Sequence, residues 1–203
     1  AFLKVPERSV VYSETAPSPV LIHDESLANI TPQLTQVLIA GGLPAQRAAL
    51  LGSQFGQSRQ AKSTDLFVLP SSSVIGTVNN VYFQQLVSLG VSQAQAGQLA
   101  VNGITYPLQD KWVLLPGEQE QIATATGIFN SIIKAETDKA GLAFLDANAL
   151  MNQLTTTGIS SGNFVLNAKL VTGGAFSLDG LHLTSRGSAM IANEMMKAID
   201  NTY

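Results

Sequence analysis

The fold and chemistry of this chain are indicated most clearly by one stretch, Phe176-Ser177-Leu178-Asp179-Gly180-Leu181-His182-Leu183-Thr184-Ser185-Arg186-Gly187. Asp179 and His182 stand three positions apart, on a predicted turn before an amphipathic helix. A histidine can take the proton of a serine hydroxyl near neutral pH, while a carboxylate orients the imidazole and stabilises the imidazolium. Gly180 lets the backbone turn tightly between the two residues. We therefore take Asp179 and His182 as candidate acid and base of a catalytic triad.

Helical and strand patterns alternate around this stretch in the second half of the chain. Thr184 is the expected cap of a last helix, in which an apolar stripe runs along one face. Upstream, residues 117–139 have apolar residues at helical spacing. Residues 142–145 follow as a predicted buried strand, with Asp146 at its carboxyl end as a helix cap. Helix, strand, helix order favours an α/β layered fold.

The first 110 residues are less regular and could form an insertion or a separate subregion. We expect a short strand at residues 20–22 and a buried strand at residues 66–69. Thr31 is the expected cap of a helix over residues 31–40, with Pro32 in its first turn. Three further helices are expected, at residues 44–54, 78–89 and 92–100.

The pattern D-G-L-H-L-T-x-x-G over residues 179–187, followed by A-x-x-A-N-E over 189–194, resembles the last motif block of the SGNH (GDSL-type) hydrolases. More narrowly, it is similar to GDSL-like lipases and esterases of Bacteroidetes-type bacteria. A bare D-x-x-H also occurs where an aspartate merely caps a turn, so these flanking residues decide the interpretation. The resemblance covers roughly residues 60–203 and includes the segments 66–76, 101–114, 141–150 and 173–178.

This resemblance implies a three-layer α/β/α fold, formed by residues 1–203 as a single domain or as the C-terminal part of one. It implies hydrolysis of a small-molecule or lipid ester through an acyl-enzyme, with Asp179 orienting His182 and His182 serving as general base and then general acid. It implies no cofactor and no metal. A secreted or envelope location in a bacterium is an expectation from the resemblance.

Two motifs that the family requires are missing from the sequence. Neither the G-D-S turn with the nucleophilic serine nor the G-x-N-D loop of the oxyanion hole occurs. One explanation is that the chain is the C-terminal portion and the nucleophile lies on a missing N-terminal segment, as the absent initiator methionine suggests. Such a portion would expose apolar surface and form homo-oligomers.

The other explanation is that divergent residues within the chain serve instead. Ser26 follows the strand-like run at 20–22 and lies 153 residues before Asp179, and Asn79 or Asn80 could stand in for the oxyanion asparagine. Serine at such a place is also typical of a turn, which is the interpretation that we prefer for Ser26.

Composition excludes several other classes of function. Cysteine is absent and only His23 and His182 occur, so thiolate sites and multi-imidazole metal sites are excluded within one chain. His23 stands beside Asp24 and Glu25, and we expect a surface histidine among acids. The net charge is −3 with no basic run, which argues against nucleic-acid binding. No apolar stretch is long enough for a transmembrane helix.

Two functions therefore remain open from the sequence. The first is a carboxylic ester hydrolase of the SGNH class. The second is a non-catalytic binding module derived from that fold, which the missing nucleophile and oxyanion motifs favour. The single tryptophan, Trp112, is expected in the core, and Gly173-Gly174 is expected to form a turn.

Overall fold

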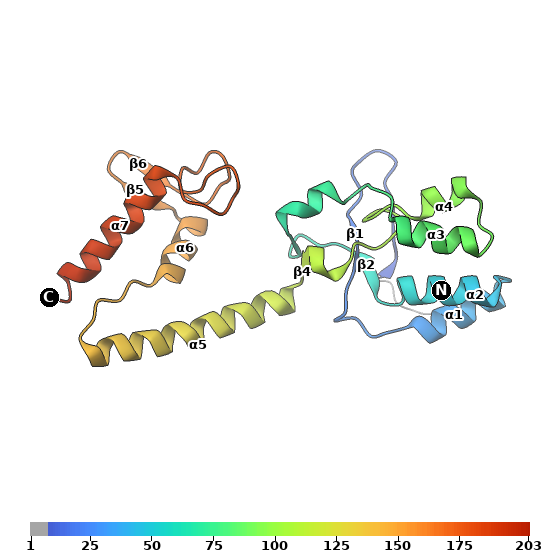
Figure 1. The fold of residues 1–203 in the computed structure, drawn as a ribbon, viewed down its shortest axis with the longest axis horizontal. Helices are drawn as coiled ribbons and strands as arrows, with labels where there is room; N and C mark the ends of the chain where they lie inside the picture. The colour runs from blue at the N-terminus through green and yellow to red at the C-terminus, as the bar shows by residue number, and fades with distance from the viewer. Residues whose placement is uncertain (1–7) are drawn as a thin grey trace. The chain divides into compact units, whose positions relative to one another are not determined.

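A computed structural model describes residues 8–203 of the chain, apart from the side chain of Ser161. It divides the chain into two compact units, the first ending at Glu120 and the second spanning Gln121–Tyr203. Figure 1 shows the elements of each unit. The single domain expected from the sequence stays a prediction.

The N-terminal unit combines short helices with two small antiparallel sheets. Strand β1 pairs with β2, and β3 pairs with β4. Its helices and strands are β1 (Leu21–His23), α1 (Thr31–Ala40), α2 (Ala45–Phe55), β2 (Ser58–Gln60), β3 (Leu66–Phe67), η2 (Leu69–Ser73), α3 (Asn80–Ser88), α4 (Gln93–Leu99), η3 (Asp110–Trp112) and β4 (Val113–Leu114).

Two apolar clusters form the core of this unit. Ile22 and Leu108, both without exposed surface, pack with Val113 and Leu115 beside the strands. The half-buried Trp112 packs against this cluster, as expected for a core residue. Between α3 and α4, the second cluster contains Tyr82, Leu86, Ala96 and Ala100. Burial of these apolar side chains, at about 25 cal/mol per Å², stabilises the packing of the short elements.

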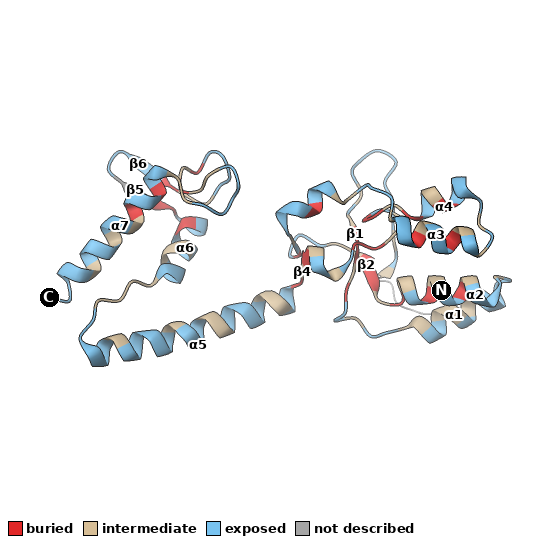
Figure 2. Ribbon diagram, viewed as in Figure 1, coloured by how far each residue is buried: buried red, intermediate tan, exposed pale blue. Residues whose placement is uncertain are grey.

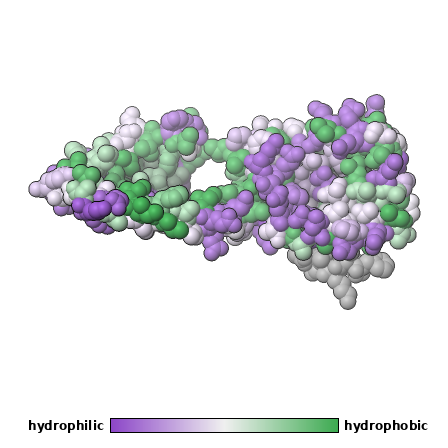
Figure 3. Space-filling view, turned by 60° about the horizontal axis from the view of Figure 1, so that its bottom comes forward, coloured by the Kyte–Doolittle hydropathy of each residue, from purple (hydrophilic) through white to green (hydrophobic). Residues whose placement is uncertain are grey.

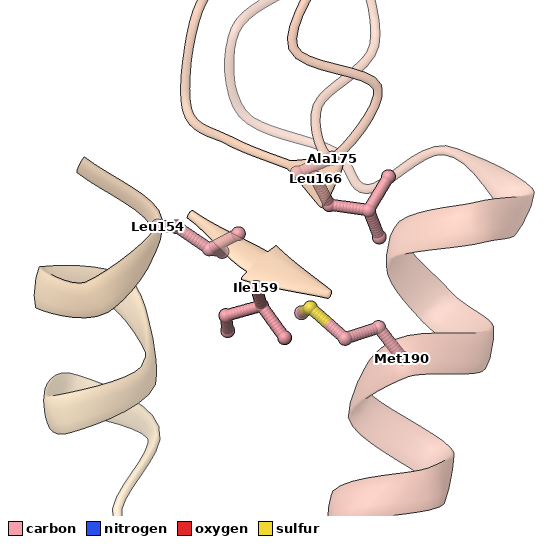
Figure 4. Close-up of a cluster of buried hydrophobic side chains, with 5 residues drawn as sticks. All are labelled: Leu154, Ile159, Leu166, Ala175 and Met190. Atoms are coloured by element: carbon pink, nitrogen blue, oxygen red, sulfur yellow. The ribbon is translucent and has the colours of Figure 1, made fainter. Parts of the chain in front are cut away.

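The C-terminal unit contains most of α5 (Pro116–Ala140), together with α6 (Ala147–Thr156), β5 (Ile159–Ser161), β6 (Phe164–Leu166) and α7 (Ser185–Asp200). Strands β5 and β6 form an antiparallel hairpin. Five side chains from α6, the hairpin, the following loop and α7 meet in one core: Leu154, Ile159, Leu166, Ala175 and Met190 (Figure 4). This core holds the N-terminal half of α7 against the loop that precedes it.

Helix α5 contains no buried residue (Figure 2). The sequence correctly predicted this helix and its stop at Gly141, which has a φ of 64°. Its apolar side chains are nevertheless half or more exposed: Ile122, Ile128, Phe129, Ile132 and Ile133. Further apolar side chains lie at the surface of the C-terminal unit (Figure 3), including Met195 and Met196 of α7. The unit therefore exposes apolar surface.

The mixture of helices and strands agrees with the α/β class at its coarsest level. Among the described residues the three sheets are two-stranded and antiparallel. The predicted helices at 31–40, 44–54, 78–89 and 92–100 are confirmed to within a few residues. No helix in this part of the chain combines the length and apolar character needed to cross a membrane.

Three local predictions were wrong. Residues 142–145 form no strand, because no segment among residues 8–203 pairs with them. Leu66 of β3 is 52% exposed rather than buried, since this two-residue strand pairs on one side with β4. Thr31 does not cap α1, since its hydroxyl donates to the carbonyl of Gly52 in α2 (3.1 Å).

Candidate active site

A tight hairpin before α7 carries Asp179 and His182. Phe176 and Leu183 pair across its base, and the amide of Ser177 donates to the carbonyl oxygen of His182 (2.8 Å). At the tip, Gly180 has a φ of 72° and its amide donates to the carbonyl of Ser177 (3.0 Å). Glycine adopts this left-handed conformation at no steric cost, so the turn closes within a few residues.

The Asp179 carboxylate faces both the imidazole and the backbone of this hairpin. Its Oδ2 atom lies 2.6 Å from Nδ1 of His182. Its Oδ1 atom accepts the hydroxyl of Ser177 (2.5 Å) and the amides of Leu181 and His182 (3.0 Å each). These hydrogen bonds, that from Ser177 above all, hold the pKa of Asp179 well below its ordinary value. The carboxylate is therefore ionised at neutral pH.

An ionised carboxylate only accepts hydrogen bonds, so Nδ1 of the neutral His182 ring carries the proton. The lone pair then resides on Nε2, for which the described residues provide no hydrogen-bond partner. The side chain of His182 is 78% exposed, so Nε2 is accessible to a substrate or to a hydroxyl group. This is the arrangement of a general base that a carboxylate orients.

The residues after the hairpin explain why the motif continues L-T-x-x-G. The hydroxyl group of Thr184 accepts a hydrogen bond from the amide of Gly187 (3.1 Å), as predicted for the cap of α7. The same hydroxyl donates to the carbonyl oxygen of Gly174 (2.6 Å). A Cβ atom on Gly187 would lie 2.3 Å from the carbonyl oxygen of Ala175. The threonine and the glycine thus seat the start of α7 directly against the loop before the hairpin.

Ser26, the serine that the sequence offers as an internal nucleophile, lies in a turn after β1, in the N-terminal unit. Its hydroxyl donates to Oδ1 of Asp24 (2.5 Å), which also accepts its amide (2.9 Å). Burial opposes the charge of Asp24, but hydrogen bonds from Ser26 and Arg59 outweigh it and lower the pKa of Asp24. A carboxylate of lowered pKa is a weak base, so Ser26 has the surroundings of a turn residue.

Asn79 and Asp146 both serve as helix caps. The side chain of Asn79 accepts the amide of Tyr82 at the start of α3 (3.0 Å) and donates to Asn102 (3.3 Å). Its amide group is thus engaged within the N-terminal unit, and Asn80 is the first residue of α3. Asp146 accepts the amide of Ala149 (2.9 Å), which confirms its predicted capping role at α6.

The expectation of a surface histidine among acids at His23 was wrong in part. His23 is half-buried at the end of β1, and Asp24 is only 2% exposed. Asp24 is buried together with the guanidinium of Arg59, and no local sequence pattern indicates this pairing. Arg59 pairs with Asp24 through Nε (2.5 Å) and with Asp65 through both Nη atoms (2.7 and 2.8 Å). This buried ion cluster ties β1 and β2 to the loop before β3.

Ser177, within the stretch 176–187, is a further residue of the site whose role was not predicted from the sequence. A hydroxyl two positions before an aspartate that a glycine turn follows is the signal that could have identified it. In the part of the chain that the structure describes, no three His, Asp or Glu side chains are placed to hold a metal ion.

The chain matches no protein-family model, no curated protein and no solved structure. The resemblance to the SGNH hydrolases therefore depends on the motif residues themselves, and the function has to be argued from the chemistry of the hairpin.

Proposed function

We propose that the chain belongs to a serine-type carboxylic ester hydrolase of the SGNH (GDSL) class, with Asp179 and His182 as acid and base. The observation that carries the proposal is the 2.6 Å contact between Oδ2 of Asp179 and Nδ1 of His182, which leaves Nε2 accessible. The three-layer α/β/α arrangement of that class is part of the proposal. So are the bacterial secreted or envelope location and the ester substrate.

The reaction follows from the tautomer of His182. Nε2 takes the proton of a serine hydroxyl as its oxygen forms a bond to the ester carbonyl carbon. The tetrahedral adduct then collapses, and the departing alcohol receives that proton from Nε2. Water repeats the sequence on the acyl-enzyme and releases the acid. Throughout, the Asp179 carboxylate stabilises the imidazolium that forms at each proton transfer.

Two exposed leucines adjoin the acid and the base in the sequence. Leu178 directly precedes Asp179 and Leu181 directly precedes His182, and their side chains are 78% and 75% exposed. Exposed leucines next to an exposed imidazole favour the hydrocarbon part of an ester over a sugar or a charged substrate. We therefore place small-molecule or lipid esters ahead of glycan esters as substrates.

The test is hydrolysis of p-nitrophenyl acetate and butyrate by the chain, its His182→Ala variant and its His23→Ala variant. General acid–base catalysis contributes about 10²–10⁴-fold, so His182→Ala should lower the rate by about a hundredfold or more. His23→Ala, which removes the other histidine of the chain, should leave the rate unchanged. Equal rates for all three proteins would contradict the assignment.

The second candidate function is a non-catalytic binding module. The observation that favours it is that Ser26 and Asn79, the internal candidates for nucleophile and oxyanion donor, engage their polar groups in a turn and a helix cap. A fluorophosphonate probe separates the two functions. Stoichiometric labelling of one serine supports the hydrolase, whereas the absence of labelling and of turnover supports the binding module.

A further inference from the structure

We infer that Ser177 is the positioning residue of the Asp179–His182 pair: its hydroxyl orients the carboxylate so that Oδ2 faces the imidazole. This inference rests on the proposed function for its catalytic consequence. Its structural content, the placing of one carboxylate by one hydroxyl, is tested without any substrate.

Ser177 forms hydrogen bonds with both His182 and Asp179, through its backbone amide and its hydroxyl group. Its amide donates to the carbonyl oxygen of His182 (2.8 Å), which fixes the backbone that carries the imidazole. Its hydroxyl donates to Oδ1 of Asp179 (2.5 Å). Removal of the hydroxyl alone therefore leaves the backbone hydrogen bond of the hairpin in place and takes away one of the three hydrogen bonds to Oδ1.

The orientation of a carboxylate about its last side-chain bond is soft, because sp³–sp² torsions have broad minima. Two backbone amides also reach Oδ1, those of Leu181 and His182, but both approach from the turn that follows Asp179. Ser177 precedes Asp179 in the chain, next to the bridge between Phe176 and Leu183. The three donors together hold Oδ1 in place, and Oδ2 is then directed toward Nδ1 of His182.

No other charged side chain of the described residues pairs with Asp179. The guanidinium of Arg186, in the first turn of α7, lies over the ring of Phe164 at 4.3 Å from its centroid. The hydroxyl of Ser177 is accordingly the largest cause of the lowered pKa of Asp179, ahead of the imidazole itself. An exposed hydroxyl that merely faced water would have no such effect.

The experiment compares Ser177→Ala, Ser177→Thr and, as a matched control, Ser185→Ala, which removes a hydroxyl with no hydrogen bond to Asp179 in the described residues. Nitrogen-15 NMR of the imidazole reports which ring nitrogen carries the proton, and carbon-13 NMR of the carboxyl reports the titration of Asp179. Amide shifts of residues 176–183 report whether the hairpin stays closed.

We expect Ser177→Ala to raise the pKa of Asp179 and to reduce the excess of the Nδ1–H tautomer, with the hairpin still closed. Ser177→Thr should restore both, and Ser185→Ala should alter neither. An unchanged tautomer and an unchanged Asp179 titration in Ser177→Ala overturn the inference. An opened hairpin in that variant also overturns it, because the serine would then hold the backbone rather than the carboxylate.

Turnover is measured on the same variants. If the chain hydrolyses esters through His182, Ser177→Ala should lower kcat about fivefold with little change in KM, because the amides of Leu181 and His182 still hold Oδ1 in part. An unchanged kcat overturns the catalytic part of the inference. If the chain does not hydrolyse esters but Ser177→Ala gives the expected NMR changes, Ser177 still positions the carboxylate and the proposed function is overturned instead.

Discussion

The Oδ2 atom of Asp179 lies 2.6 Å from Nδ1 of His182, although both side chains are mostly exposed, at 51% and 78%. Exposed ion pairs are ordinarily loose and contribute little to stability. This contact is kept in place by the hairpin itself, since Oδ1 of the same carboxylate accepts three further hydrogen bonds from residues 177–182. We therefore expect the loss of this contact to lower the catalytic rate and to leave the free energy of unfolding nearly unchanged.

Asp179→Asn should lower the His182-dependent rate of ester hydrolysis by about tenfold or more. An asparagine can present its amide nitrogen to Nδ1, which then has to accept a hydrogen bond, so the ring proton moves to Nε2. In that tautomer His182 cannot take a proton from a hydroxyl group. Steady-state kinetics beside nitrogen-15 NMR of the ring measures both effects, and a normal rate with the proton on Nε2 would contradict the mechanism.

Gly187→Ala should destabilise the C-terminal unit by about 2 kcal/mol, as expected when an added methyl group forces the backbone apart. The cause is the 2.3 Å distance from the new Cβ to the carbonyl oxygen of Ala175. Gly127→Ala is the matched control, because nothing lies within 4 Å of a Cβ at that position in α5. The control should stabilise α5 by about 0.5–1 kcal/mol. Urea unfolding followed by circular dichroism compares the two, and equal effects would show that Gly187 tolerates a side chain.

Acid should destabilise the N-terminal unit through the buried pairs of Arg59. Hydrogen bonds from Arg59 lower the pKa of Asp65 against the effect of burial, and the pKa of Asp24 is lowered as well. A carboxyl whose folded-state pKa is depressed contributes stability above its unfolded value, about 3.9, and loses it as the pH falls through the folded value. The free energy of unfolding should thus be level from pH 7 to about pH 5 and fall below pH 4.

The fluorescence of Trp112, the single tryptophan, reports the unfolding of this unit during urea titrations at pH 7, 5 and 3. Asp65→Asn removes one partner of a buried pair and should cost about 3–5 kcal/mol at pH 7. The same substitution should make the loss of stability below pH 4 shallower. If the free energy of unfolding fell as steeply below pH 4 in Asp65→Asn as in the unchanged chain, carboxyl groups other than Asp65 would cause the loss of stability.

The apolar face of α5 should cause the chain to self-associate, because Phe129 is 63% exposed and four isoleucines of the helix are half or more exposed. Phe129→Glu should lower the mass measured by light scattering at a given concentration and reduce the binding of a hydrophobic dye. Ser131→Glu adds the same charge to an exposed position of the helix outside this set and should leave both unchanged. A monodisperse monomer at high concentration would count against self-association.

The hairpin could be predicted from the sequence because its determinants are local. Asp179, Gly180, His182, Thr184 and Gly187 each act on residues at most a dozen positions away. The same holds for the helices, whose periodicity and stop signals lie within the helix or next to it.

Features that depend on distant partners could not be predicted in the same way. The pairing of Arg59 with Asp24 joins positions 35 residues apart, and no local pattern announces it. Residues 142–145 have the composition of a strand, but a strand also needs a neighbour that pairs with it. Periodicity likewise identified the apolar face of α5 correctly and gave no information about what contacts that face.

Phe176 and Leu183 close the hairpin, so the acid and the base lie within one short segment that can be transferred from one protein to another. Closing a loop this short costs little chain entropy, and its contacts are of low sequence separation. The hairpin and the first turn of α7 thus hold the acid, the base and the hydrogen-bond partners of the carboxylate in one continuous segment. Any scaffold that offers a helix start and presents a hydroxyl to Nε2 could acquire the same chemistry by accepting that one segment.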